Sequence, residues 1–351
     1  MKADNTLYFC TLFDKNFITR GLSMYQSLAK TCTKFHLYIF CFDDTTHEVL
    51  SRVNLENVTL ITLSEFEDEE LLKAKSTRSR KEYCWTCTPS TILFCLKKNI
   101  PHCIYIDADL YFWNLPQLII DEIPDSKSVL ITEHNYSKEH DQTEYSGRFC
   151  VQFMYFKNTT DGLEVANWWR NACNEWCYAR FEDGKFGDQK YLDSWPDKFA
   201  QVYIMENEGA GIAPWNVQKY SFTYENSVLT ATHEQSKKKW PVIFYHFHFL
   251  RNGKTNNYFI SPQRYSLSKT AMDIIYKEYI LTLQKVHLSL NSLKLDFNPH
   301  GICSDFHVRN FWDYLRVCLS EIARGMMHLN FKKMISTIKH RLNEFYILKI
   351  N

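Results

Sequence analysis

Two features are missing from this 351-residue chain. No uninterrupted apolar run approaches the ~20 residues that a membrane-spanning helix needs. The first residues, MKADNTLYFC, lack the basic start and long apolar stretch of a secretory signal peptide. We therefore expect a protein that is made and kept in a reducing cytoplasm, with its 12 cysteines mostly free.

The chain also lacks an excess of charge of either sign. Lys and Arg number 41 against 40 Asp and Glu, so the net charge of +1 offers no electrostatic case for binding nucleic acid. We find no internal repeat and no low-complexity tract. Hydrophobic residues make up 45% and charged residues 23%, which is typical of an ordinary globular protein. The aromatic content of 16% suits a packed core and also suits surfaces that stack on sugar rings.

The first third of the chain alternates between strand-like and helix-like patterns. Such alternation predicts an α/β fold with a mostly parallel sheet that is covered by helices on both faces. Strands are expected at 6–13, 35–42, 58–63 and 102–107, and helices at 17–30, 46–55 and from Thr88-Pro89 onward, with Thr88 as N-cap.

The second half predicts two regions. Short apolar runs, a long helix over 161–180 and further strands continue to about Pro262, so we place an α/β domain at 1–265. The remainder, 266–351, has a helical pattern. Its last segment, from Arg324 onward, is a basic amphipathic helix that could lie on an anionic membrane surface or dock on the first domain.

Two aspartates follow the strand HCIYI. Asp107 and Asp109 are two residues apart, so an extended backbone would place both carboxylates on one side. Two hard oxygen ligands suit Mg²⁺ or Mn²⁺, with a substrate diphosphate completing the coordination shell. The plain structural alternative is a turn with exposed acids. An aspartyl-phosphate phosphatase would need this motif in its first strand with Gly-Thr after it, and here Leu110-Tyr111 follows.

Three further segments accompany this motif, in order along the chain: TLFDKNFITRGLSMYQSL near the start, FGDQKYLDSWP, and FYHFHFLR. Together the four segments resemble the GT-A (Rossmann-like) glycosyltransferases, which use nucleotide sugars. The likeness is greatest to the retaining group of bacterial lipopolysaccharide galactosyltransferases and glycogenin, and to transferases of bacterial surface-polysaccharide clusters. It spans roughly residues 5–255 and implies a GT-A fold.

The resemblance assigns roles to individual residues. Base and ribose would be held by Thr11, Asp14 and Asn16. The donor sugar would lie beside Asp188 and Gln189, although the Asn that follows in the family is absent here. A late histidine of the family corresponds best to His246, which would join Asp107 and Asp109 as metal ligand. Phe249 replaces the family's next glycine, and its Lys-Pro-Trp is missing.

The chemistry of the same segments supports these roles and leaves alternatives open. His246 and His248 share one face of a strand, so either imidazole could ligate a metal. Asp188 could instead cap a helix. Other candidates for the donor's phosphate or sugar are Arg78 and Arg80 in the basic stretch 75–83, Trp215 and Asn216 in the loop GAGIAPWN, and Arg251.

Cys84 and Cys87 form a Cys-x-x-Cys pair that could be half of a zinc site. The second half would have to be Cys173 and Cys177. Their spacing on a Trp-rich helix fits core packing better.

These observations predict a metal-dependent glycosyltransferase with Mn²⁺ or Mg²⁺ as cofactor. The resemblance implies a nucleotide diphosphate sugar, most often a UDP-sugar, as donor and a glycan or lipid-linked saccharide as acceptor, in surface-polysaccharide synthesis. The resemblance implies retention of configuration, whereas inversion would make Asp188 the general base. A sugar-phosphate nucleotidyltransferase would need a glycine-rich loop after the first strand, which DKNF lacks. A non-catalytic nucleotide-sugar-binding module is the remaining alternative.

Overall fold

The computed structural model describes residues 6–253, 257–262, 265–301 and 345–349. The chain divides into two compact units. The first runs to His248 and includes Ser268–His300, and the second comprises Phe249–Leu267 and the chain from Gly301 onward. The helix α10 (Lys277–Leu290), which lies beyond the boundary predicted near residue 265, packs on α1 (Ile18–Thr31) within the first unit.

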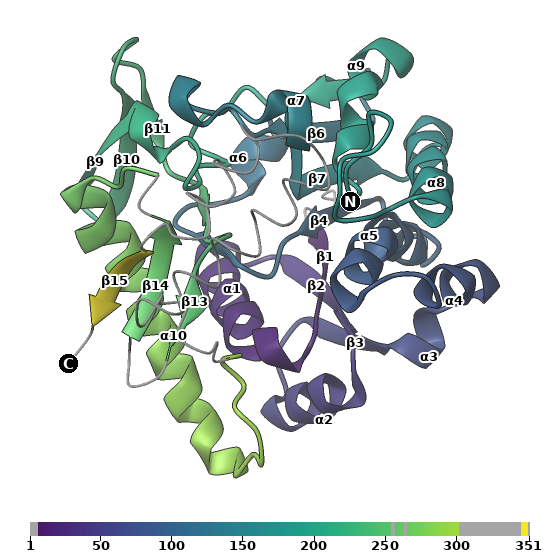
Figure 1. Cartoon of the computed structure of the whole chain (residues 1–351), viewed down its shortest axis with the longest axis horizontal. Coiled ribbons are helices and arrows are strands. Elements are labelled where there is room, and N and C mark those ends of the chain that lie inside the picture. Colours follow the sequence, from purple (N-terminus) through teal and green to yellow (C-terminus); the bar gives the residue numbers. More distant parts are fainter. Residues whose placement is uncertain (1–5, 254–256, 263–264, 302–344, 350–351) are drawn as a thin grey trace, which may run out of the picture. The chain divides into compact units, whose positions relative to one another are not determined.

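The first unit is built on a seven-stranded sheet (Figure 1). Neighbouring strands are parallel from β3 to β4 and between β6 and β8, and β7 is antiparallel to both of its neighbours. The predicted mostly parallel α/β sheet is therefore confirmed. In spatial order the strands are β3 (Val58–Thr62), β2 (Phe35–Cys41), β1 (Leu7–Phe13), β4 (His102–Ile106), β7 (Phe149–Lys157), β6 (Val129–Glu133) and β8 (Val202–Ile204).

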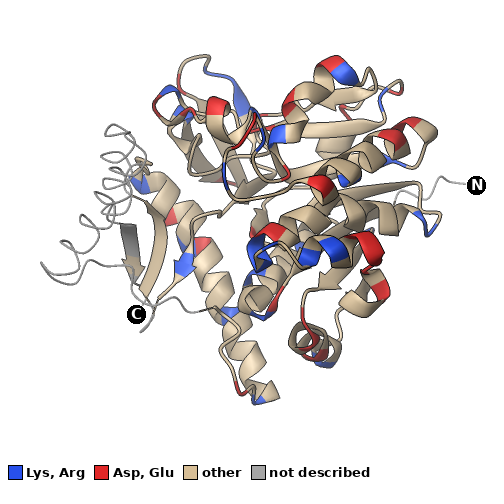
Figure 2. Cartoon of the chain, turned by 45° about the vertical axis from the view of Figure 1, so that its right-hand side comes forward, with Lys and Arg blue, Asp and Glu red and all other residues tan. Residues whose placement is uncertain are grey.

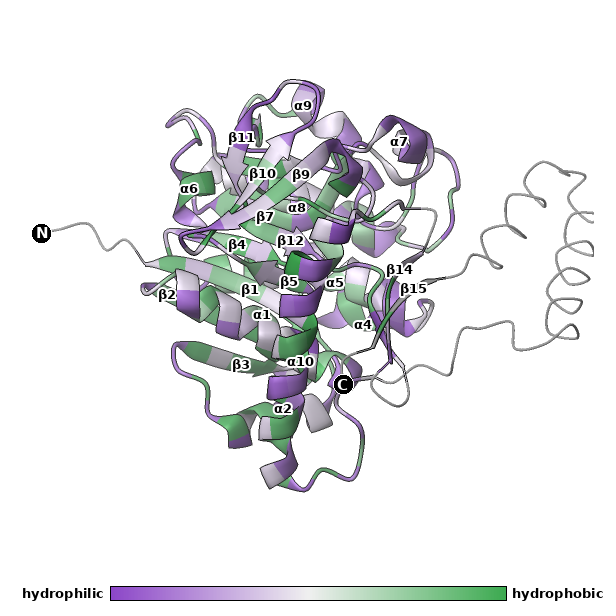
Figure 3. Ribbon diagram, turned by 90° about the vertical axis from the view of Figure 1, so that its left-hand side faces the viewer, coloured by the Kyte–Doolittle hydropathy of each residue, from purple (hydrophilic) through white to green (hydrophobic). Residues whose placement is uncertain are grey.

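Helices cover both faces of this sheet, and each face has its own apolar core. One core lies under α5 (Arg80–Leu96) and α8 (Thr160–Glu175), and the other under α1, α2 (Asp44–Val53) and α10. Apolar and polar residues alternate along α1 and α10, as Figure 3 shows. Short helices complete the unit at α3 (Leu63–Phe66), α4 (Glu69–Lys75), α6 (Gln117–Ile120), α7 (Thr143–Ser146) and α9 (Trp195–Lys198).

Smaller sheets complete the described chain. The ribbon of β5 (Leu110–Phe112) and β12 (Phe244–His246) lies in the first unit, as does the sheet of β9 (Tyr220–Glu225), β10 (Val228–His233) and β11 (Lys239–Pro241). The second unit contains β13 (Arg251–Asn252), β14 (Asn257–Pro262) and β15 (Phe345–Lys349). Residues 345–349 are thus a strand, where the sequence pattern predicted the end of a helix. Most of that predicted amphipathic helix lies outside the described residues.

The start of α5 corrects a prediction. We expected a helix to open at Thr88-Pro89, but α5 begins at Arg80 and carries Pro89 inside it. A reciprocal capping box explains this start, because the Ser79 hydroxyl accepts from the backbone of Glu82 while the Glu82 carboxylate accepts from the backbone of Ser79. The cost of the proline is offset by tertiary packing, since most of α5 is buried against the sheet and α8.

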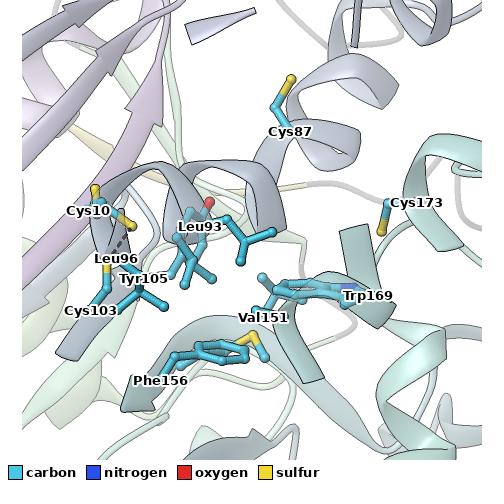
Figure 4. Packing of buried hydrophobic residues seen from close by; sticks show 14 of the residues in the cluster. Cys10, Cys87, Leu93, Leu96, Cys103, Tyr105, Val151, Phe156, Trp169 and Cys173 are labelled. Atoms are coloured by element: carbon cyan, nitrogen blue, oxygen red, sulfur yellow. Dashed lines mark hydrogen bonds between the residues drawn. The ribbon is translucent and has the colours of Figure 1, made fainter. Parts of the chain in front are cut away.

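The core under α5 and α8 contains several cysteines with large apolar side chains (Figure 4). Burial raises the pKa of Cys87 well above its ordinary value, so this thiol is neutral. Within the described part of the chain, two groups of at least three side chains could hold a metal: Cys10–Cys95–Cys103 and Asp107–Asp109–His246. Neither group contains Cys84 or Cys87, so their Cys-x-x-Cys pair is part of a packed helix.

Acidic and basic residues alternate over the helices of the first unit (Figure 2), in keeping with the near-zero net charge. None of the described helices is both long and apolar enough to cross a membrane.

Candidate metal centre

Asp107 and Asp109 flank a turn that connects β4 to β5. The turn is closed by the Leu110 N–H, which donates to the Asp107 carbonyl at 3.3 Å. The expected extended backbone is therefore wrong at this point, because the strand ends at Ile106. The backbone N–H of Asp107 donates to the carbonyl of Gln152 on β7 at 3.0 Å, which ties the turn to the central sheet.

His246 reaches the same place from a distant part of the sequence. It lies on β12, directly opposite Leu110 of β5. Its Nε2 atom is 3.2 Å from Oδ1 of Asp109 and 3.6 Å from Oδ2 of Asp107. The three candidate ligand atoms all lie within 4.8 Å of one another. The structure thus brings together the metal ligands predicted from sequence and favours His246 over His248.

This arrangement fits a single divalent cation. Neighbouring ligands around an octahedral ion with bonds of about 2.1 Å are about 3 Å apart, close to the distances between Nε2 and the carboxylates. Two carboxylates and one imidazole are a donor set that suits Mn²⁺. The other ring nitrogen of His246, Nδ1, lies 2.8 Å from Oε1 of Gln152. An Nδ1–H that donates to this oxygen leaves Nε2 directed at the carboxylates.

Burial of these charges shifts their pKa values in opposite directions. Burial raises the pKa of Asp107 to about 6; the charge of His246 opposes this, and the nearby Asp109 adds a smaller upward effect. Burial would also raise the pKa of Asp109, but the imidazolium of His246 lowers it well below its ordinary value. Burial would lower the pKa of His246, and Asp109 outweighs this and raises it. Asp109 and His246 therefore stabilise each other's charged forms.

Asp188 is a second buried acid beside this centre. It is only 4% exposed, and burial followed by repulsion from Asp107 raises its pKa to about 7. Its backbone carbonyl accepts from the indole N–H of Trp169 at 2.9 Å. Gly187 precedes it with φ of +54°, and a side chain there would press on Trp85. The Nε2 amide of Gln189 donates to the Ser146 carbonyl at 2.6 Å.

The loops that follow β1 and β2 form a network around Arg80. Its Nε is 2.7 Å from Asp14 and its Nη2 is 2.7 Å from Asp43. Asp14 also accepts from the backbone N–H of Asn16, whose side chain is exposed. Thr11 is fully buried on β1, and its hydroxyl has no hydrogen-bond partner among the described residues. Ligands of open α/β sheets bind at these carboxyl ends of strands.

Two other predicted arginines donate to backbone carbonyls. Arg78 packs on the ring of Tyr178 and donates to the carbonyls of Asn174 and Glu175, at the end of α8. These contacts fasten the helix end. Arg251 belongs to the second compact unit, where its Nη1 donates to the carbonyl of Leu250 at 3.0 Å.

The loop GAGIAPWN packs against His246. The Trp215 indole N–H and the Asn216 amide both donate to the carbonyl of His134. The Trp215 ring lies edge-on to His246, with ring centroids 5.4 Å apart, and is only 5% exposed. Asn216 also accepts from Ala213 and is 2% exposed. The structure therefore gives both residues partners within the protein, beside the metal centre.

Sequence reasoning missed three residues of this region. Gln152 interrupts an otherwise apolar strand, RFCVQFMYF, which was a visible signal of a special role. The Tyr105 hydroxyl donates to Oδ1 of Asp107 at 3.0 Å. Burial would raise the pKa of Asp43, but hydrogen bonds from Thr46 and the Arg80 charge lower it. Only the tertiary structure connects these three residues to the site.

Fold and site together define an α/β protein with a candidate metal centre at the carboxyl ends of its strands. The chain belongs to the family of two uncharacterized Bacillus subtilis (strain 168) proteins. It is 31% identical to YfnD over 304 residues, 84% of this chain and 94% of YfnD. It is 30% identical to YfnF over 302 residues, 84% of this chain and 97% of YfnF. No family model matches the chain.

Several solved structures are similar to this one. The galactosyltransferase LgtC, in complex with donor and acceptor sugar analogues, has a TM-score of 0.44 at 11% identity, over 80% of this chain and 96% of that one. The Streptococcus pneumoniae TIGR4 glycosyltransferase GlyE has a TM-score of 0.48 at 11% identity, over 84% of this chain and 65% of that one. The bifunctional glycosyltransferase WbbM has a TM-score of 0.40 at 10% identity, over 61% of this chain and 40% of that one.

Proposed function

We propose that this protein is a metal-dependent glycosyltransferase that moves a sugar from a nucleotide diphosphate sugar, a UDP-sugar, to a hydroxyl group of a saccharide acceptor. One observation carries the proposal. Asp107, Asp109 and His246 place their ligand atoms within 4.8 Å of one another, and the buried Asp188 lies beside them. A cluster of acids at the carboxyl ends of strands suits a cation that binds a diphosphate.

Each residue of the centre has its own proposed role. Asp107, Asp109 and His246 would hold Mn²⁺ or Mg²⁺, and the Tyr105 hydroxyl orients Asp107. When bound, the cation supplies positive charge that stabilises the departing nucleoside diphosphate. We assign to Asp188 the role of accepting hydrogen bonds from the donor sugar, which would orient the sugar for attack by the acceptor.

The nucleoside would lie over the loops that follow β1 and β2. The exposed amide of Asn16 donates to Asp14 at 3.4 Å and has a second N–H for a base or ribose. Arg80 is paired with Asp14 and Asp43, so its role is to hold these two loops in place rather than to bind a phosphate directly. The buried hydroxyl of Thr11 on β1, which has no hydrogen-bond partner among the described residues, is a further polar group near these loops.

The acceptor and the stereochemistry complete the proposal. We propose a glycan or lipid-linked acceptor in bacterial surface-polysaccharide synthesis at the cytoplasmic side of the membrane, and transfer with retention. Under the alternative of inversion, Asp188 would act as general base, a role for which its pKa of about 7 is suitable. The anomeric configuration of the product, followed by proton NMR during turnover, distinguishes the two.

The first test is thermal unfolding with UDP, GDP or CDP, each with and without Mn²⁺. A ligand present at about 100 times its Kd adds about 2.7 kcal/mol to the free energy of unfolding. We expect a Mn²⁺-dependent stabilisation by UDP that is lost in the double variant Asp107→Asn, Asp109→Asn. The matched control is Asp193→Asn, an acid that pairs with Lys190 outside the centre. It should keep the full response. If no nucleotide stabilises the folded wild-type protein, the proposal is wrong.

A further inference from the structure

Gln152 contacts the metal centre through both its backbone and its side chain. Its carbonyl accepts from the N–H of Asp107 at 3.0 Å. Its Oε1 lies 2.8 Å from Nδ1 of His246. The side chain is completely buried on β7, within a strand whose other residues are mostly apolar. A buried polar group in such a strand is costly unless its hydrogen bond matters to the fold or to a site.

The surroundings hold the amide of Gln152 in one place. A side chain at Gly211 would come within 3.0 Å of Nε2 of Gln152, so the loop packs directly on this amide. Gly211 has φ of +88°, a conformation that suits glycine. Beside it, the backbone N–H of His246 donates to the carbonyl of Ile212 at 2.9 Å. The Trp215 ring lies nearly perpendicular to the imidazole of His246, with ring centroids 5.4 Å apart.

We propose that Gln152 is a positioning residue that prepares His246 to bind the metal, an inference that rests on the metal centre of the proposed function. Its Oε1 accepts the Nδ1 proton of His246. In the neutral imidazole that binds a metal, this hydrogen bond would fix the tautomer in which the lone pair of Nε2 faces Asp107 and Asp109. Histidines that bind metals nearly always donate their other ring N–H to such an acceptor.

The amide also sets the charge of the centre. Two carboxylates and a neutral imidazole balance the charge of one divalent cation. An uncharged acceptor at position 152 orients the ring without adding a third negative charge beside an anionic diphosphate. A glutamate at this position would orient the ring equally well, so the two properties can be separated by substitution.

The test measures Mn²⁺ binding without nucleotide, from the loss of the electron paramagnetic resonance signal of free Mn²⁺. We expect Gln152→Met, similar in length but without the oxygen acceptor, to weaken Mn²⁺ binding by about 10–100-fold. Gln152→Glu keeps the acceptor and should bind Mn²⁺ at least as tightly as wild type. The matched control is Thr132→Val, which removes another buried hydrogen bond, from Thr132 to the Phe153 carbonyl at 2.8 Å. It should bind Mn²⁺ like wild type.

A second readout reports the orientation of the ring itself. With ¹¹³Cd²⁺ as probe, the coupling of the metal to ring ¹⁵N nuclei identifies which nitrogen of His246 is the ligand. We expect Nε2 in the wild type and in Gln152→Glu, and loss of this single assignment in Gln152→Met. A change in stability alone would not move the coupling from one nitrogen to the other.

The outcomes separate this inference from the proposed function. Wild-type Mn²⁺ affinity in a folded Gln152→Met, or equal weakening in Thr132→Val, overturns the positioning role. So does loss of Mn²⁺ binding in Gln152→Glu, which remains decisive even if Gln152→Met does not fold. A wild-type protein that binds no Mn²⁺ overturns both proposals. The expected order of affinities without turnover of any nucleotide sugar keeps the role of Gln152 and rejects glycosyl transfer.

Discussion

Ionisation of the buried Asp188 should lower the free energy of unfolding of the metal-free protein at high pH. The side chain is 4% exposed, and its pKa is raised from 3.8 to about 7, by burial first and then by Asp107. An acid whose pKa is raised in the folded state favours folding below its unfolded pKa. This contribution is lost as pH rises through the folded pKa. Asp188→Asn, which keeps the shape and cannot ionise, should therefore stabilise the protein at high pH.

The magnitude follows from the two pKa values. A difference of one pKa unit corresponds to about 1.4 kcal/mol, so ionising Asp188 costs the folded state at most ~4 kcal/mol at pH 8. Relaxation and entry of water reduce this, and we expect Asp188→Asn to raise the free energy of unfolding by roughly 2 kcal/mol at pH 8. The gain should shrink toward zero between pH 7 and pH 4. The same substitution should abolish transfer, since the proposed function uses Asp188 beside the donor sugar.

The assay is urea unfolding of both proteins at pH 5 and pH 8, with EDTA present so that no metal occupies the centre. Asp193→Asn serves as the matched control, because Asp193 lies in the same segment and pairs with Lys190 at 2.9 Å. It should leave the protein slightly less stable at both pH values. A gain for Asp188→Asn that is absent at pH 8, or that is equal at pH 5 and pH 8, would refute the reasoning.

Two further predictions concern packing and ion pairs. A side chain at Gly162 would meet the Lys157 carbonyl at 2.1 Å, so Gly162→Ala should lower the free energy of unfolding by about 3 kcal/mol. Gly184→Ala meets nothing within 4 Å and should cost only about 1 kcal/mol, from its φ of +74°; equal losses in urea unfolding would contradict this contrast. Arg170→Met removes a half-buried guanidinium that contacts Asp68 at 2.6 Å, and should cost about 1–2 kcal/mol without changing Mn²⁺ binding.

The arginines of the basic stretch show where local sequence stops being informative. Arg78 and Arg80 are two residues apart, and nothing in the local pattern ranks them as donor contacts. The capping box at Ser79 starts α5 between them and so separates their directions. Arg80 turns toward Asp14 and Asp43 at the ends of β1 and β2, and Arg78 turns toward the end of α8. The directions of both side chains depend on where α5 begins, and its start was predicted at Thr88-Pro89 instead of Arg80.

The antiparallel strand β7 is the corresponding case in the sheet. Its apolar pattern marks RFCVQFMYF as a buried strand but carries no information about direction or neighbours. Its insertion between β4 and β6 places Gln152 next to the turn of Asp107. The pattern therefore predicted the strand, and only the topology could reveal why it carries a glutamine.

The sequence by itself determined the strand and helix alternation of the first unit and the position of the aspartates at the end of β4. Both depend on the local spacing of apolar residues, which predicts helices and strands directly. The tertiary structure decided which distant groups complete the centre. His246 and Gln152 are 94 residues apart and form a hydrogen bond only because β12 pairs with β5 while β7 pairs with β4. Pairing between strands distant in sequence is a property of the whole fold, and no local pattern encodes it.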